Sequence, residues 1–202
     1  GFYLALPFIL IRAWVRGRHT AGYRQRIPER LGFYKTTLAP NPIWLHAVSY
    51  GEAAAADPLI TRLLERYPDH PLLVTTMTGT GAARIAQRFA GKVTHRYLPY
   101  DFPGATERFY QNSKPCLAII METELWPNLL RTFARHQVPI LLANARLSEQ
   151  SCRGYRRIRR LTQQMMREIT LIAAQDDADA VRFQQLGALP QQIVVAGNLK
   201  FD

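Results

Sequence analysis

Two adjacent segments decide the fold of this chain: Cys116-Leu117-Ala118-Ile119-Ile120-Met121 and, directly after it, Glu122-Thr123-Glu124-Leu125-Trp126-Pro127-Asn128. The apolar first segment predicts a buried strand, and the proline is favourable as an early helical residue. Two carboxylates therefore follow the carboxyl end of a strand, where open α/β sheets bind ligands. A second interpretation stays open, in which these acids only stabilise a helix start through the helix dipole.

Seven short apolar runs alternate with helical patterns after residue 40. The runs are Ile43–Ser49, Leu72–Met77, Val93–Leu98, Cys116–Met121, Ile140–Asn144, Leu171–Ala174 and Ile193–Ala196. The helical patterns cover Glu52–Tyr67, Gly81–Phe89, Pro103–Gln111, Pro127–His136, Ser148–Met166 and Asp177–Leu186. This alternation predicts an α/β fold with a doubly wound, mostly parallel sheet.

We expect three parts in the chain. Residues 1–40 form a basic, helical lead-in, and residues 41–196 form one α/β lobe. The 202 residues, of which 48% are hydrophobic, are enough for one well-buried domain of this class. Residues 197–202 come just after a strand, and we interpret them as the start of a linker to a second lobe.

The formal net charge of +11 comes from 26 basic and 15 acidic residues. It predicts an acidic partner: nucleic acid, anionic lipid or a phosphorylated substrate. The basic residues gather in two clusters, although either cluster could simply be a solvated face. The first contains Arg12, Arg16, Arg18, Arg24, Arg26, Arg30 and Lys35, and the second contains Arg146, Arg153, Arg156, Arg157, Arg159, Arg160 and Arg167.

The first eleven residues carry no charge, and arginines follow them at once. A membrane-spanning helix needs ~20 apolar residues, so this segment is too short as it stands. We expect a helix on the membrane surface, or the end of an anchor that begins earlier. Trp14 and Tyr23 could lie at the level of the lipid headgroups, with the arginines facing anionic lipid.

Cysteine and histidine usage gives no sign of a metal site. The chain has two cysteines and five scattered histidines, without the paired spacing of zinc ligands. We expect Cys116 to pack inside its strand. His46 and His95 fall in predicted strands and are interpreted as packed core or rim residues.

Glu52 is the candidate base. It follows the strand Ile43–Ser49 and opens a helix, where backbone N–H groups and the helix dipole favour an ionised carboxylate. A plain first-turn glutamate remains the alternative. The turn Thr75–Gly81, with hydroxyls and two glycines, could hold an anion, but it matches neither a dinucleotide fingerprint nor a P-loop.

Six ordered motifs closely resemble the Kdo (3-deoxy-D-manno-octulosonic acid) transferase family, and the resemblance covers essentially the whole chain. They are His46–Glu52, Thr75–Thr78, Tyr97–Asp101, Met121–Asn128, Asn144–Ser148 and Gly197–Asp202. The resemblance implies the Rossmann-like amino-terminal lobe of a GT-B glycosyltransferase. Such a lobe handles the acceptor, a lipid A precursor (lipid IVA), while a carboxyl-terminal lobe binds the donor CMP-Kdo.

The same resemblance assigns roles to three residues. Glu52 becomes the proton acceptor of an inverting transfer, and Glu122 and Lys200 become transition-state stabilisers. Glu124 receives no role. Two positions depart from the family pattern: Gly79 stands where a proline is common, and Tyr50 replaces a small aliphatic residue and could reshape the acceptor pocket.

The resemblance also implies lipopolysaccharide synthesis at the cytoplasmic face of the bacterial inner membrane, an anionic surface. It implies no metal or other cofactor and no nucleic-acid partner, and we expect the chain to be inactive alone. Two alternatives stay open. One is a basic α/β module that binds nucleic acid along Ser148–Met166. The other is a GT-B enzyme that uses another nucleotide sugar.

Overall fold

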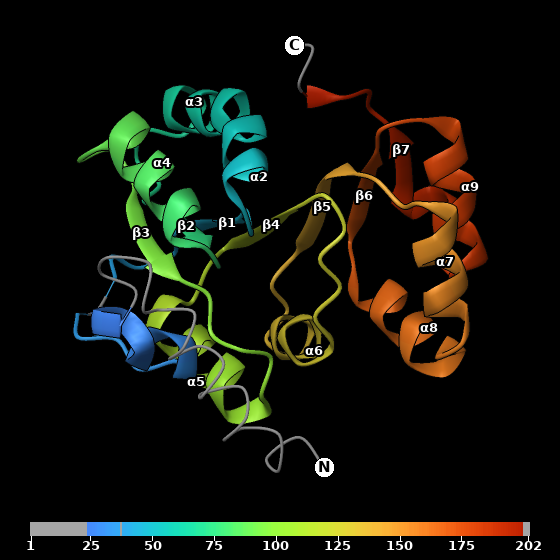
Figure 1. Ribbon diagram of the computed structural model, residues 1–202, viewed down its shortest axis with the longest axis horizontal. Helices are drawn as coiled ribbons and strands as arrows, with labels where there is room; N and C mark the ends of the chain where they lie inside the picture. The colour runs from blue at the N-terminus through green and yellow to red at the C-terminus, as the bar shows by residue number, and fades with distance from the viewer. Residues whose placement is uncertain (1–23, 37, 200–202) are drawn as a thin grey trace.

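The computed structural model describes residues 24–36 and 38–199. Over these residues the chain forms one parallel sheet with helices on both faces (Figure 1). The strands are β1 Ile43–His46, β2 Leu72–Thr76, β3 Thr94–Tyr97, β4 Leu117–Met121, β5 Ile140–Ala145, β6 Leu171–Ala174 and β7 Ile193–Val195. All pairings are parallel, which confirms the predicted doubly wound α/β fold.

The helices follow the strands closely. They are α2 Tyr50–Ala55, α3 Asp57–Arg66, α4 Gly79–Phe89, α5 Pro103–Ser113, α6 Pro127–Arg135, α7 Glu149–Arg156, α8 Arg159–Glu168 and α9 Asp177–Gln185, with 3-10 helices η1 Arg24–Leu31 and η2 Pro190–Gln192. No helix within the described ranges is long and apolar enough to cross a membrane. The expected surface helix at the amino terminus lies outside these ranges.

The strand order reverses at the centre of the sheet, which is the position where folds of this class bind their ligands. The order is β3-β2-β1-β4-β5-β6-β7, so the chain leaves β1 in one direction and continues from β4 in the other. Loops that leave the carboxyl ends of two such strands diverge and open a crevice between them. Any catalytic group after β1 or β4 therefore lies at this point.

Alternate side chains of each strand pack into two cores. Trp44, together with Phe109 and Phe133, belongs to the core under α5, α6, α8 and α9. Leu45, the next residue, points to the opposite core with Ile60 from α3, where α2 and α4 also pack. In Figure 1, α2, α3 and α4 lie together on one side of β1–β3, and α5 and α6 lie on the other. This burial on both faces explains why the strands are continuous apolar runs.

Two predicted helices are each broken into two. The pattern Glu52–Tyr67 forms α2 and α3, because the chain turns at Ala56 and a new helix begins at Asp57, with Pro58 in its first turn. The pattern Ser148–Met166 forms α7 and α8, because Ile158 leaves the helical conformation at φ −111°. The expectation for Cys116 is also wrong: β4 begins one residue later, and Cys116 is exposed.

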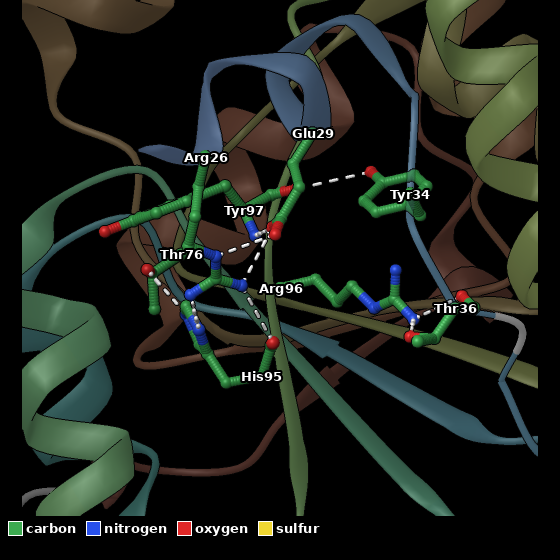
Figure 2. Close-up of polar contacts among 8 residues, drawn as sticks. All are labelled: Arg26, Glu29, Tyr34, Thr36, Thr76, His95, Arg96 and Tyr97. Atoms are coloured by element: carbon green, nitrogen blue, oxygen red, sulfur yellow. Dashed lines mark hydrogen bonds and ion pairs between the residues drawn. The ribbon is translucent and has the colours of Figure 1, made fainter. Parts of the chain in front are cut away.

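The described part of the basic lead-in packs on the lobe. Glu29 of η1 accepts a hydrogen bond from the backbone N–H of Tyr97 at 2.8 Å, and Arg26 donates to the carbonyl of His95 at 3.0 Å (Figure 2). Because β3 is an edge strand, one side of its backbone has no neighbouring strand. The side chains of Glu29 and Arg26 form hydrogen bonds with two backbone groups of this strand. Arg26 also forms an ion pair with Glu29, and Arg30 is only 1% exposed. These two arginines therefore face the protein, unlike a cluster that meets an external partner.

Candidate functional site

Glu52 lies in the first turn of α2, directly beyond β1. Ser49 caps the helix by accepting a hydrogen bond from the N–H of Glu52 at 3.4 Å. In return, Glu52 Oε1 accepts from Ser49 Oγ at 3.1 Å, and Oε2 accepts from the N–H of Val48 at 2.8 Å. The carboxylate is therefore held against the carboxyl end of the central strand, at the crevice.

The surroundings of Glu52 favour its protonated form. Burial raises the pKa of Glu52 from 4.5 to about 7, and the charges of Glu124 and Glu122 also raise it. The hydrogen bonds from Val48 and Ser49 act in the opposite direction. A general base is most effective when its pKa lies near the working pH. A helix-start role explains the bond to Ser49 but not the burial or the two neighbouring carboxylates.

Glu122 follows β4 in a left-handed backbone conformation, with φ 56°. Its N–H donates to the carbonyl of Ala143 at 2.8 Å, which continues the pairing of β4 with β5. For a residue with a Cβ this conformation costs about 1–2 kcal/mol, and such strain is concentrated at functional sites. The predicted residue is thus in the vicinity of Glu52, since its charge acts on that carboxylate.

Glu124 belongs to the same carboxylate group. Its Oε2 accepts a hydrogen bond from Trp126 Nε1 at 2.8 Å. Burial raises the pKa of Glu124, and the charge of Glu122 adds to this effect. Burial also raises the pKa of Tyr155 on α7, with a smaller contribution from Glu124. The family resemblance assigned no role to Glu124, whereas the structure couples it electrostatically to Glu52.

Asn144, at the end of β5, was not singled out as a site residue. It is 2% exposed and has a left-handed backbone with φ 55°. Its Oδ1 accepts a hydrogen bond from the N–H of Leu199 at 3.2 Å, so it holds the chain one residue before Lys200. Lys200 itself lies outside the described residues, and its role stays a prediction. Two signals were available in the sequence: the position of Asn144 at a strand end and its place in the motif Asn144–Ser148.

The turn between β2 and α4 packs close to the loop that holds Glu52. Thr78 caps α4 by accepting from the N–H of Gly81, which is thereby occupied inside the protein. A Cβ on Gly81 would lie 3.3 Å from the carbonyl carbon of Ser49, so glycine allows this turn to approach the Glu52 loop. The proposed anion-binding role of this turn stays a prediction.

The two strand histidines are packed, as predicted. His46 is fully buried, and its Nδ1 lies 2.8 Å from Thr75 Oγ1. Burial lowers the pKa of both His46 and His95 to about 3, so both are neutral at physiological pH. In residues 24–36 and 38–199, no group of three or more His, Cys, Asp or Glu side chains is placed to hold a metal ion.

Asp101, the last residue of the motif Tyr97–Asp101, holds the start of α6. Its carboxylate accepts hydrogen bonds from the N–H groups of Asn128 and Leu129, at 3.0 and 2.8 Å. Without Asp101 these two N–H groups, in the first turn of α6, would have no partner within the helix. Asp101 therefore fixes the start of the helix that follows the Glu122 loop, and the sequence alone had not assigned this function.

A family model described as 3-deoxy-D-manno-octulosonic-acid transferase matches residues 25–202. The chain belongs to the Kdo transferase family. The 3-deoxy-D-manno-octulosonic acid transferase of Haemophilus influenzae is 41% identical over 198 residues, which cover 97% of this chain and 46% of that protein. The Bordetella pertussis enzyme of the same name is 38% identical and covers 97% of this chain and 47% of its own length. The chain thus spans about half the length of the curated relatives it matches.

Solved structures with a similar fold include UDP-N-acetylglucosamine 2-epimerases. The Neisseria meningitidis enzyme bound to UDP-GlcNAc has a TM-score of 0.57 and 13% identity, over 78% of this chain and 47% of that one. The S. aureus MnaA–UDP complex has a TM-score of 0.57 and 19% identity, over 79% and 44%. At this identity the similarity supports only the fold, and it agrees with the Rossmann-like sheet of the Kdo transferase family.

Proposed function

We propose that the chain is the acceptor-side lobe of a glycosyltransferase that transfers Kdo from CMP-Kdo to a lipid A precursor in lipopolysaccharide synthesis. The observation that carries the proposal is the position of the Glu52 carboxylate in the loop after β1, where the strand order of the sheet reverses. Burial there raises its pKa to about 7. Membership of the Kdo transferase family supports the choice of sugar.

In the proposed reaction, Glu52 removes the proton from an acceptor hydroxyl. The oxygen attacks the anomeric carbon of Kdo from the face opposite CMP, so the carbon–oxygen bond forms while the bond to the phosphate breaks. CMP leaves with the bonding electrons and the configuration inverts. A positioned base typically contributes ~10²–10⁴-fold, or roughly 3–5 kcal/mol of barrier.

Two further residues support the transition state in this proposal. Glu122 stabilises the positive charge that develops on the sugar ring, as carboxylates do in glycoside chemistry. Lys200 supplies a cation for the departing phosphate. The bond between Asn144 and Leu199 supports this role, because it fixes the backbone immediately before Lys200.

The acceptor is proposed to dock along the basic face of α7 and α8 while the enzyme lies on the anionic inner membrane. A cavity of about 510 Å³ there is lined by Tyr155, Arg156, Arg159, Thr162, Gln185 and Leu186. Exposed Ile158 and Leu161 lie in the same region, with 49% and 41% of their surface accessible. Arginines beside exposed apolar residues suit a phosphorylated lipid, because they bind its charge and its chains together.

The test uses the full-length enzyme with CMP-Kdo and tetra-acylated lipid A precursor, and counts the sugars added by mass spectrometry. The proposal predicts that the precursor gains at least one Kdo mass and that CMP is released. A parallel titration with duplex and single-stranded nucleic acid tests the alternative. Tight, sequence-selective binding without sugar transfer would overturn the proposal.

A further inference from the structure

Arg30 of η1 is almost completely buried, although it lies outside the loop that holds the candidate base. It is 1% exposed, and its Nη2 donates a hydrogen bond to the carbonyl of Met77 at 2.9 Å. Its guanidinium lies over the ring of Tyr97, 4.4 Å from the centroid, and its carbonyl accepts from the N–H of Tyr100 at 2.8 Å. Arg30 therefore ties η1 to the turn that follows β2.

Two more hydrogen bonds connect this turn to Glu52. The N–H of Met77 donates to the carbonyl of Val48 at 3.0 Å. The N–H of Val48 donates to Glu52 Oε2 at 2.8 Å. Three bonds thus lead in succession from the Arg30 guanidinium to the carboxylate, and each bond fixes the backbone that makes the next one.

A second route from η1 reaches the same turn (Figure 2). Arg26 Nη1 lies 3.1 Å from His95 Nδ1, and His95 Nε2 lies 3.0 Å from Thr76 Oγ1. A guanidinium can only donate, so Nδ1 is the acceptor and Nε2 carries the proton. Nε2 therefore donates to Thr76, whose hydroxyl donates to the carbonyl of Thr78 at 3.2 Å. Both arginines therefore hold this turn, Arg30 directly at Met77 and Arg26 through His95 at Thr76.

The orientation of the carboxylate depends on these donors. Glu122 and Glu124, from the loop after β4, repel the ionised form of Glu52. The N–H of Val48 and the hydroxyl of Ser49 attract it. A shift of the Val48 backbone would weaken the shorter of the two attractive contacts and leave the repulsion unchanged.

We propose that Arg30 is a positioning residue for the base: it holds the turn at Met77, and through Val48 it keeps the Glu52 carboxylate in the orientation that removes the acceptor proton. This inference rests on the proposed function of Glu52. It gives Arg30 a role inside the lobe and separates it from the arginines expected to meet lipid.

The test compares Arg30→Met with Arg108→Met in the full-length enzyme. Arg108 is a matched control, because it also donates to a carbonyl of η1, that of Leu31, from an exposed position outside the route to Glu52. We expect Arg30→Met to lower kcat by ~10–100-fold, as misplacement of a catalytic group does. We also expect the acid limb of the plot of kcat/KM against pH to move ~0.5–1 pH unit higher, because the bond from the Val48 N–H, which favours the charged form of Glu52, is weakened. Arg108→Met should match wild type in both.

Arg30→Lys serves as the second variant if the methionine variant does not fold, and its acid limb should move in the same direction. The position of that limb is independent of the fraction of folded enzyme. An unchanged profile, an equal loss in Arg108→Met, or a change confined to the KM of the acceptor would each overturn the positioning role. Glu52→Gln separates the two claims. If that variant is active, the proposed function of Glu52 fails, whereas if it is inactive and Arg30→Met behaves as wild type, only the positioning role fails.

Discussion

Replacing Glu52 by glutamine should stabilise the protein at alkaline pH. The carboxylate is held among two other acids, and burial raises its pKa from 4.5 to about 7. The folded protein therefore binds the proton of Glu52 more tightly than the unfolded chain does. The stability that comes from this proton is fully present below pH 4.5 and is lost as pH rises through 7. Glutamine mimics the protonated form at every pH.

The difference between 4.5 and about 7 corresponds to ~3.4 kcal/mol at 1.36 kcal/mol per pH unit. Glu52 is only partly buried, and solvent screening reduces the expected gain to about 1–2 kcal/mol at pH 8. Near pH 4.5 and below, the variant and the wild type should differ little. In glutamine the amide oxygen can take the place of Oε2 and keep the bond from the Val48 N–H, while the amide NH2 in the place of Oε1 can donate to Ser49 Oγ, so the cap is preserved.

Urea unfolding of the full-length protein at pH 4.5 and pH 8 measures this difference. The control is Glu149→Gln, since Glu149 is also a first-turn glutamate but has an exposed side chain, with 71% of its surface accessible. The Glu52 variant should gain stability over wild type only at pH 8, and the Glu149 variant at neither pH. Equal destabilisation by Glu52→Gln at both pH values would refute the argument that burial and the neighbouring acids disfavour the ionised form of Glu52 in the folded protein.

Three further substitutions test a charge, a hydrogen bond and a core position. Glu124→Gln removes a charge that raises the pKa of Glu52, so the acid limb of the pH–rate profile should move to lower pH; movement to higher pH would contradict the coupling. Asn144→Ala removes the acceptor for the Leu199 N–H, and kcat should fall by ~10-fold while the acid limb stays in place. Phe133→Ala empties a fully buried core position and should cost about 3–5 kcal/mol in urea unfolding, whereas a cost below 1 kcal/mol would mean the core collapses around it.

The strands could be predicted because parallel strands buried on both faces are written as local apolar runs. Leu171–Ala174 has the predicted bounds, and the other runs differ from the observed strands by one to three residues at an end. The helix break at Ala56 was missed although Pro58 signals the start of a new helix, and the break at Ile158 was missed because the surrounding residues continue a helical pattern. Cys116 was misplaced because an apolar run does not show where pairing begins.

The site was predictable where it depends on strand ends, and not where it depends on distant contacts. Glu52 and Glu122 each follow a strand, and parallel topology brings such ends to one edge. The burial of Arg30 could not be read from the sequence, since its partner Met77 is 47 residues away. The electrostatic coupling of Glu124 likewise depends on how the loop after β4 folds toward α2.

Glu52 is proposed to remove the proton from the acceptor hydroxyl. The most direct measurement is the Kdo transfer rate of Glu52→Gln in the full-length enzyme, beside Glu149→Gln as the matched control. We expect a loss of ~10²-fold or more for Glu52→Gln, with the fold and the binding of the acceptor retained, and an unchanged rate for the control. A rate for Glu52→Gln within about tenfold of wild type would contradict the claim, because a positioned base contributes more than that.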